Sequence, residues 1–116
     1  MLQVYGIKNC NTVKKALDWL EANKLDYTFY DFKKEPATLA KLQAWEKSVG
    51  WQALLNKKGT TWRKLSPEQQ AQVVDAPSAL AVLLDNNSMI KRPVIELASE
   101  TILGFDEAIY ESKLLK

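Results

Sequence analysis

Cys10 is the one cysteine of this 116-residue chain, and the chain contains no histidine. Histidine is the usual general base of enzymes and the commonest metal ligand, so its absence argues against a serine–histidine triad and against metal catalysis. We therefore expect no metal site. One cysteine cannot form an internal disulfide. Catalysis by this chain must then use Cys10, carboxylates, lysine or arginine.

The position of Cys10 favours a reactive thiolate over the small buried apolar residue that a lone cysteine often is. The apolar, β-favouring residues 2–5 predict a buried strand, and a turn-rich loop follows at residues 6–11. Apolar residues then recur at helical spacing from Val13, and Asn11 or Thr12 is expected to cap that helix. Amide groups and the dipole at a helix N-terminus stabilise an anion. Cys10 is thus the predicted nucleophile.

Polar and charged neighbours of Cys10 are expected to hold the thiolate and the substrate. Asn11, Thr12 and the first helical N–H groups would hold the thiolate, while Lys8 and Lys14 add positive charge for an anionic substrate.

The segment from Cys10 to Val13 carries no second cysteine, so it is not a Cys-x-x-Cys motif. A monothiol mechanism needs its second thiol from outside, and glutathione or another protein would supply it. We therefore expect glutathione as co-substrate and no bound cofactor.

Composition and charge exclude several classes of protein. The formal charge of +2 is too small for a dedicated polyanion binder, so we expect no nucleic-acid partner. No stretch reaches the roughly 20 apolar residues of a membrane span, and the N-terminus lacks the features of a signal peptide. These observations predict a cytoplasmic monomer that binds no membrane.

The order of predicted elements indicates an α/β protein with a thioredoxin-like fold. Strands are expected at residues 2–5 and 25–32 with a helix between them, and at 89–97 and 101–105, followed by a helix from Glu107. Residues 36–88 are mostly helical in pattern, with proline and serine marking helix starts near residues 36 and 66. Residues 76–78 interrupt the pattern, and a further helix is expected at residues 79–85. The sequence therefore predicts one domain, 1–116, with a small mixed four-stranded sheet and an inserted helical region at about 36–88.

Two further features follow from that fold. Arg92-Pro93 would lie on the strand that enters the active-site edge, where thioredoxin-like folds carry a cis proline. Arg92 could then face Cys10 and bind a carboxylate, oxyanion or thiolate; the alternative is a solvated strand end. Residues 56–64 hold four of the sixteen basic residues. They form either a solvated loop or an anion or partner site beside the thiolate.

Four strings of residues resemble the arsenate reductase-like proteins, ArsC and Spx together, and the resemblance covers essentially the whole chain. The first string is close to the YffB branch of that family. The resemblance implies a thioredoxin-like domain with a helical insert and Cys10 as nucleophile. The strings are Val4-Tyr5-Gly6-Ile7-Lys8-Asn9-Cys10-Asn11-Thr12-Val13-Lys14-Lys15-Ala16, Tyr30-Asp31-Phe32-Lys33-Lys34, Leu54-Leu55-Asn56 and Ile90-Lys91-Arg92-Pro93-Val94.

Departures from the family pattern decide between functions. In the arsenate branch three arginines bind the oxyanion, and Arg92 is the one that matches here. Asn56 stands at the second position, and Gly104-Phe105 at the third. The second cysteine of the Spx regulators is also absent. The favoured hypothesis is therefore a glutathione-dependent monothiol oxidoreductase, and the alternatives are an arsenate reductase or a non-enzymatic, Spx-like protein-binding module.

Overall fold

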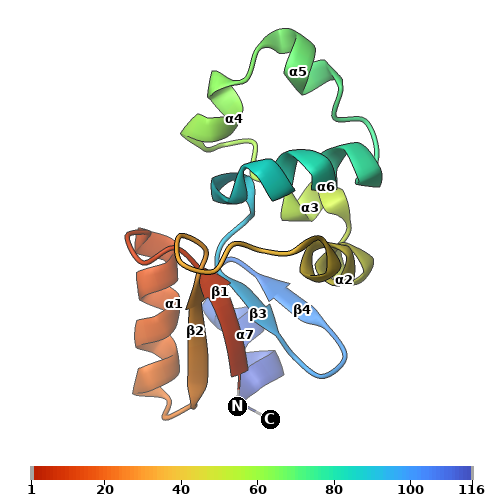
Figure 1. Cartoon of the computed structure of the whole chain (residues 1–116). Helices are drawn as coiled ribbons and strands as arrows, with labels where there is room; N and C mark the ends of the chain where they lie inside the picture. Colours follow the sequence, from red (N-terminus) through yellow and green to blue (C-terminus); the bar gives the residue numbers. More distant parts are fainter. Residues whose placement is uncertain (1, 116) are drawn as a thin grey trace.

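A mixed four-stranded sheet forms the centre of the protein (Figure 1). The structure is a computed structural model that describes residues 2–115. Strand order is β2-β1-β3-β4; β1 and β2 are parallel, and β3 is antiparallel to both β1 and β4. This β-α-β unit followed by a β-hairpin and a helix confirms the thioredoxin-like fold. Its elements are β1 (Leu2–Gly6), α1 (Asn11–Ala22), β2 (Tyr27–Asp31), β3 (Val94–Glu96), β4 (Thr101–Leu103) and α7 (Glu107–Leu114).

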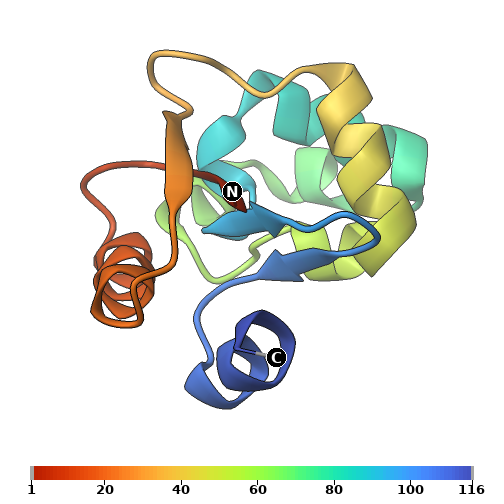
Figure 2. The ribbon, with the colours of Figure 1, turned by 90° about the horizontal axis from the view of Figure 1, so that it is seen from below.

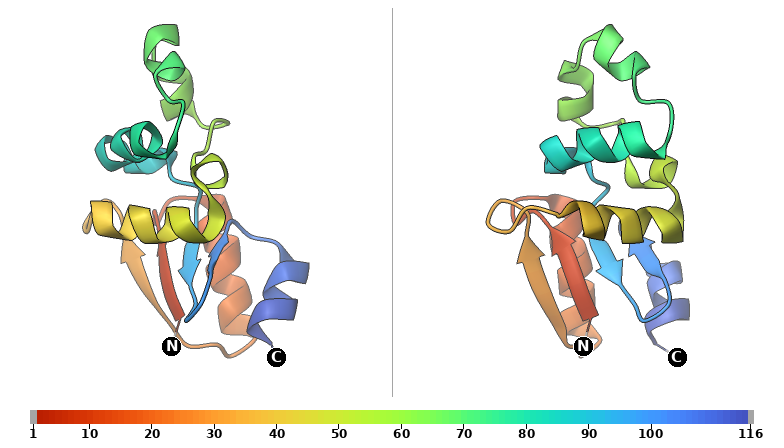
Figure 3. Two further views of the ribbon diagram at one scale, coloured as in Figure 1. Left: turned by 90° about the vertical axis from the view of Figure 1, so that its right-hand side faces the viewer. Right: turned by 45° about the vertical axis from the view of Figure 1, so that its right-hand side comes forward.

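Six helical segments lie between β2 and β3 (Figure 3). The first of them packs across a face of the sheet near one end, and the others stack beyond that end. The α6 helix begins at residue 76, three residues earlier than its apolar pattern suggests. Asp75 and Ser78 form a capping box there, in which the Asp75 carboxylate accepts from the Ser78 N–H at 3.0 Å. The segments are α2 (Leu39–Val49), α3 (Trp51–Leu54), α4 (Thr60–Lys64), α5 (Pro67–Ala71), α6 (Ala76–Asp85) and the short 3₁₀ helix η1 (Asn87–Met89).

Helices cover the two faces of the sheet, and each face has its own apolar cluster (Figure 2). Val4, Ile95 and Ile102 pack on the face covered by α1 and α7, where Leu20 and Tyr110 meet them. Alternation along a strand sends neighbouring side chains to opposite faces. The second cluster, on the other face, joins the sheet to α2, α3 and α6; its buried members include Phe32, Leu42, Trp45, Leu54, Leu83, Met89, Ile90 and Val94.

The third strand is shorter than predicted. The predicted range, residues 89–97, is wrong at both ends. Ile90 pairs instead with Leu55 of the insert in an isolated antiparallel bridge. Two backbone hydrogen bonds hold this bridge, from Asn56 to the Met89 carbonyl and from Lys91 to the Leu54 carbonyl, each 2.8 Å long. Residues 89–91 therefore belong to the junction between insert and sheet. The second strand is also shorter, since residues 25, 26 and 32 lie outside it.

Gly6 lets the first turn of α1 approach the end of β1. A Cβ atom at this buried position would lie 2.9 Å from Cγ2 of Val13, closer than real Cβ contacts allow. Glycine is therefore required for this packing. The close approach fixes where the connecting loop delivers Cys10.

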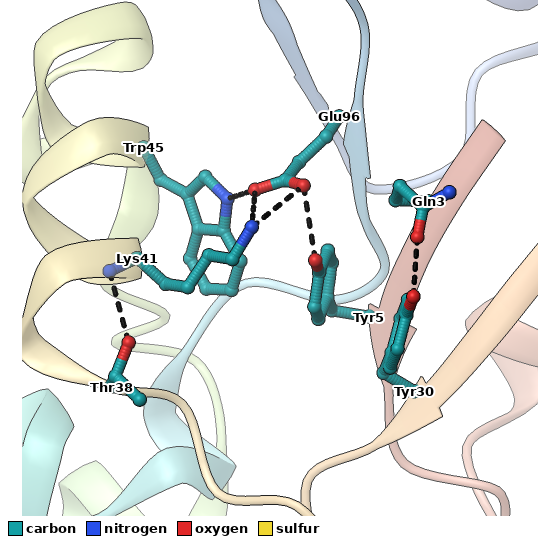
Figure 4. Close-up of polar contacts among 7 residues, drawn as sticks. All are labelled: Gln3, Tyr5, Tyr30, Thr38, Lys41, Trp45 and Glu96. Carbon is teal, nitrogen blue, oxygen red and sulfur yellow. Dashed lines mark hydrogen bonds and ion pairs between the residues drawn. The ribbon is translucent and has the colours of Figure 1, made fainter.

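The carboxylate of Glu96 ties α2 to the sheet (Figure 4). Its Oε1 accepts from the Tyr5 hydroxyl at 3.0 Å and its Oε2 from the Trp45 indole N–H at 2.7 Å, while the Lys41 ammonium donates to both oxygens at 3.1 Å. The Glu96 side chain is 20% exposed. Burial raises the pKa of Tyr5 above its ordinary value, and the Glu96 carboxylate adds to that rise, so the hydroxyl remains a donor.

Replacing Glu96 by alanine is expected to lower the free energy of unfolding by about 2–3 kcal/mol. The change leaves the buried donor Trp45 and the partly buried donors Tyr5 and Lys41 without their acceptor. The matched control is Glu100→Ala, whose carboxylate pairs with Lys113 at the surface and should contribute about 0.5 kcal/mol or less. Chemical denaturation of both variants tests the difference. Equal losses would mean that the Glu96 cluster stabilises no more than a surface ion pair.

Candidate active site

Cys10 is itself the N-cap residue of α1. The prediction that Asn11 or Thr12 caps this helix is wrong, since these are its first two helical residues. Cys10 has an extended backbone, with φ −114° and ψ 124°, and its carbonyl accepts the first helical bond from the Lys14 N–H at 2.9 Å. The side chain of an N-cap residue stands over the free N–H groups of the first turn. The helix therefore presents those groups to the sulfur.

The surroundings of Cys10 favour its thiolate. Partial burial opposes ionisation, but the polar N–H groups of Val13 and Thr12 and the positive charge of Arg92 outweigh it. These groups lower the pKa of Cys10 below its ordinary value. Helix and arginine thus act on the same sulfur.

The neighbouring loop holds Arg92 beside Cys10. Its guanidinium Nη1 donates to the Ser88 carbonyl at 2.9 Å, which leaves other N–H groups of the fork for the sulfur or for a substrate. Arg92 is half-buried, and the Arg92–Pro93 peptide bond is cis.

A cavity of about 370 Å³ opens at Cys10. Of the residues proposed from the sequence, Cys10, Thr12 and Arg92 line it. Larger hollows of about 390 and 610 Å³ lie elsewhere, but neither contains the thiol, so reactivity and not size locates the candidate active site. The complete lining of the Cys10 cavity is Cys10, Thr12, Asn56, Lys91, Arg92, Leu103, Gly104, Phe105, Asp106 and Ile109.

Three of the predicted substrate-binding residues do not line this cavity. Asn11 and Lys14 lie on the exposed surface of α1, and Lys8 lies in the exposed turn before it. Helical spacing placed these residues near the correct end of α1, but it did not determine which side chains turn toward the sulfur.

The structure brings two charged residues into the cavity that sequence reasoning missed, Lys91 and Asp106. The Lys91 stem passes over Gly104, where an added Cβ would lie 3.5 Å from Lys91 Cε. Asp106 caps α7, accepting from the N–H groups of Ala108 at 3.0 Å and Ile109 at 3.3 Å. Aspartate is a favoured N-cap residue, but the place of Asp106 in the cavity depends on how α7 packs.

The three positions that the resemblance associates with arginine do meet at this cavity. Arg92 lies there with Asn56 and with the pair Gly104 and Phe105. The cavity therefore contains one guanidinium and the Lys91 ammonium, opposed by the Asp106 carboxylate. That is much less positive charge than three arginines would supply.

The family model described as the ArsC family matches residues 5–112. The chain belongs to the ArsC family. An uncharacterised protein of Haemophilus influenzae is 42% identical to it over 112 residues, which is 97% of each chain.

Solved structures of ArsC-family proteins resemble this one closely. A protein called YffB is 42% identical, with a TM-score of 0.94 over 98% of this chain and 99% of the other. An arsenate reductase (ArsC) related protein from Brucella melitensis is 46% identical, with a TM-score of 0.77 over 97% and 92% of the two chains. Both agree with the YffB branch indicated by the first sequence string. An arsenate reductase from Vibrio cholerae, at 14% identity and a TM-score of 0.74 over 86% of each chain, shares the fold.

Membership of the ArsC family supports thiol-based oxidoreductase chemistry in general. Within residues 2–115, no three or more cysteine or acidic side chains gather where they could hold a metal ion. Over the same residues, no helix combines the length and apolar character needed to span a membrane.

The Cys10 thiol is expected to titrate below the value of about 8.5 for a free cysteine, because the helix N–H groups and Arg92 favour its anion. Ultraviolet absorbance of the thiolate, followed through a pH titration of the folded protein, measures this midpoint. Cys10→Ser supplies the baseline, including tyrosine ionisation. A midpoint at or above the free-thiol value would contradict activation of Cys10.

Proposed function

We propose that this protein is a monothiol oxidoreductase that uses glutathione to reduce disulfides. The observation that carries the proposal is the Cys10 sulfur, which stands at the N-terminus of α1 beside Arg92 in an open cavity. The chain contains no second cysteine that could resolve a disulfide. An external thiol must therefore complete each cycle.

The reaction proceeds by two thiol–disulfide exchanges. The Cys10 thiolate attacks the glutathione sulfur of a mixed disulfide R–S–S–G, so that a Cys10–glutathione disulfide forms and R–S⁻ leaves and takes a proton from water. A second glutathione thiolate then attacks the glutathione sulfur of that disulfide. Oxidised glutathione leaves, and the Cys10 thiolate is restored.

Charged groups in and near the cavity suit the charges of glutathione, which carries two carboxylates and one ammonium. Arg92 and Lys91 are proposed to meet carboxylates, and Asp106 can meet the ammonium. Thr12 holds the thiolate through its N–H. Asn11, Lys8 and Lys14, which lie outside the cavity, would contribute through their position near the same end of α1.

The cytoplasm is the compartment that suits this chemistry, because glutathione keeps thiols reduced there. We propose that the protein works there as a monomer without a bound cofactor, and that it contacts neither nucleic acid nor membrane.

Incubation with oxidised glutathione is expected to give one adduct, on Cys10, that dithiothreitol reverses. Mass spectrometry of the intact protein and of its peptides measures the adduct and its position. Cys10→Ser should give none. Absence of an adduct on the wild type, or its persistence in Cys10→Ser, would overturn the proposed mechanism. A non-enzymatic binding module would instead keep its partner after Cys10→Ser.

A further inference from the structure

Residues 57–64 of the helical insert carry four exposed cations, and we call them the basic segment: Lys57, Lys58, Arg63 and Lys64. Among residues 2–115, none of the four forms an ion pair. No acidic residue occurs between Glu46 and Glu68, so the sequence around the basic segment offers no compensating charge. The segment therefore carries a local positive potential on a protein whose net charge is small.

Hydrogen bonds at two places fasten the basic segment to the edge of the active site. The Asn56 N–H bonds the Met89 carbonyl at 2.8 Å, and the Asn56 side chain lines the Cys10 cavity directly before Lys57. In α4, the Thr61 hydroxyl bonds the Ser88 hydroxyl at 2.7 Å. Ser88 is also the residue whose carbonyl holds Arg92. The segment that carries the four cations is thus joined to the edge of the cavity, although none of the four lines it.

Trp62 holds one cation of the basic segment in place. Trp62 packs against the apolar cluster of the insert, and the Lys57 ammonium lies 5.3 Å from the centroid of its ring. A cation over an aromatic face is held by the electrostatics of the ring. Less side-chain freedom is then lost when a partner binds.

The volume of the cavity indicates that its ligand is smaller than the ligand of the basic segment. The cavity of about 370 Å³ holds the sulfur, Arg92 and Lys91, which are the groups that a small thiol needs. The four cations of the basic segment do not line the cavity, so they are available for a part of a larger disulfide substrate that extends beyond it.

We propose that the basic segment is the docking surface for a protein substrate, and that this substrate is an acidic polypeptide whose disulfide-bearing cysteine is flanked by aspartate or glutamate. The inference rests on the proposed function, because the chemistry at Cys10 requires a partner that carries sulfur. Complementary charge beside a reactive site raises the encounter rate and selects between partners. A nucleic acid would supply negative charge but no sulfur.

Binding to the Cys10→Ser protein tests the surface separately from the chemistry. The probes are two synthetic peptides, each with one S-glutathionylated cysteine, flanked by glutamate in one and by glutamine in the other. At low salt the acidic peptide is expected to bind about tenfold more tightly, and the preference should shrink as salt screens exposed charges. Equal affinity for the two peptides would overturn the proposal, as would displacement of the acidic peptide by an equimolar duplex oligonucleotide.

Paired substitutions locate the preference. Lys57→Gln/Lys58→Gln and Arg63→Gln/Lys64→Gln are each expected to lower affinity for the acidic peptide about threefold, and the four changes together should abolish the preference. The control, Lys24→Gln/Lys47→Gln, removes two exposed charges; Lys24 lies just beyond the end of α1 opposite Cys10. A preference that survives the fourfold variant, or an equal loss in the control, would contradict docking at this segment.

Kinetics distinguish failure of this inference from failure of the proposed function. With Cys10 intact, the fourfold variant should remove glutathione from the acidic peptide more slowly than the wild type does. Its rate of adduct formation with oxidised glutathione should equal that of the wild type. If the wild type forms no glutathione adduct, the proposed function fails whichever peptide binds. If the adduct forms but both peptides react equally fast, the docking inference alone fails.

Discussion

Arsenate turnover by this protein is expected to be at least about a hundredfold slower than turnover by an ArsC-family arsenate reductase assayed beside it. Two of the three positions that the family pattern associates with oxyanion-binding arginines are occupied by Asn56 and by Gly104-Phe105, and both line the Cys10 cavity. A charge-assisted contact contributes roughly 1.5–3 kcal/mol. Losing two such contacts to a highly charged transition state therefore costs about two to four orders of magnitude in rate.

Glutathione- and glutaredoxin-coupled arsenate reduction measures this rate. Asn56→Arg is the informative variant, because it places a guanidinium in the cavity beside Arg92, and we expect it to raise the arsenate rate about tenfold. Gln43→Arg adds the same charge on the exposed surface of α2 and should change the rate little. Wild-type turnover equal to that of the reductase would show that Lys91 and Arg92 suffice for the oxyanion.

Local sequence patterns were enough to predict the β-α-β unit and the place of Cys10 within it. Apolar spacing set β1 and α1 correctly, and the loop between them could deliver Cys10 only to the N-terminal end of the helix. Which residue caps α1 depends on a single backbone conformation. Asn11 and Thr12 are better capping types than cysteine, so composition favoured the wrong residues.

Local sequence patterns could not predict the contacts between segments that are distant along the chain. The bridge between Leu55 and Ile90 shortens β3 and brings Asn56 to the cavity. From the sequence alone, Lys91 is expected to be an ordinary surface lysine near a strand. Its role in the cavity arises from Gly104, which lies next to it only after β4 and the segment before β3 come together.

The contacts of Glu96, which are expected to stabilise the fold, could not be predicted from local sequence either. Glu96 lies 91 residues from Tyr5 and 51 residues from Trp45, so nothing in its neighbourhood along the chain indicates a partly buried carboxylate with three donors. Alternation along β3 sends its side chain to the face opposite that of Ile95. Which helices pack against that face depends on the course that the helical insert takes in three dimensions.

Arg92→Ala is expected to slow formation of the Cys10–glutathione disulfide about tenfold at neutral pH, if one charge-assisted contact of about 1.5 kcal/mol is lost. Stopped reactions with oxidised glutathione, quantified by mass spectrometry, give the rate. The matched control is Lys15→Ala, which removes an exposed charge from the same end of α1 but outside the cavity and should change the rate by about twofold or less. An unchanged rate in Arg92→Ala would remove Arg92 from substrate binding.

The rates of adduct formation by the wild type and by Arg92→Ala, measured as a function of pH, separate activation of the sulfur from binding of the substrate. Arg92 lowers the pKa of Cys10, so its removal should move the titration midpoint upward, and the loss of rate should be largest below that midpoint. Well above both midpoints the thiolate is fully formed in either protein. Any difference in rate that remains there measures the contact between Arg92 and a glutathione carboxylate, and it should weaken with salt because the contact is partly exposed. If the difference vanishes at high pH, Arg92 acts on the sulfur alone, and Lys91 is left as the cation in the cavity for the carboxylate.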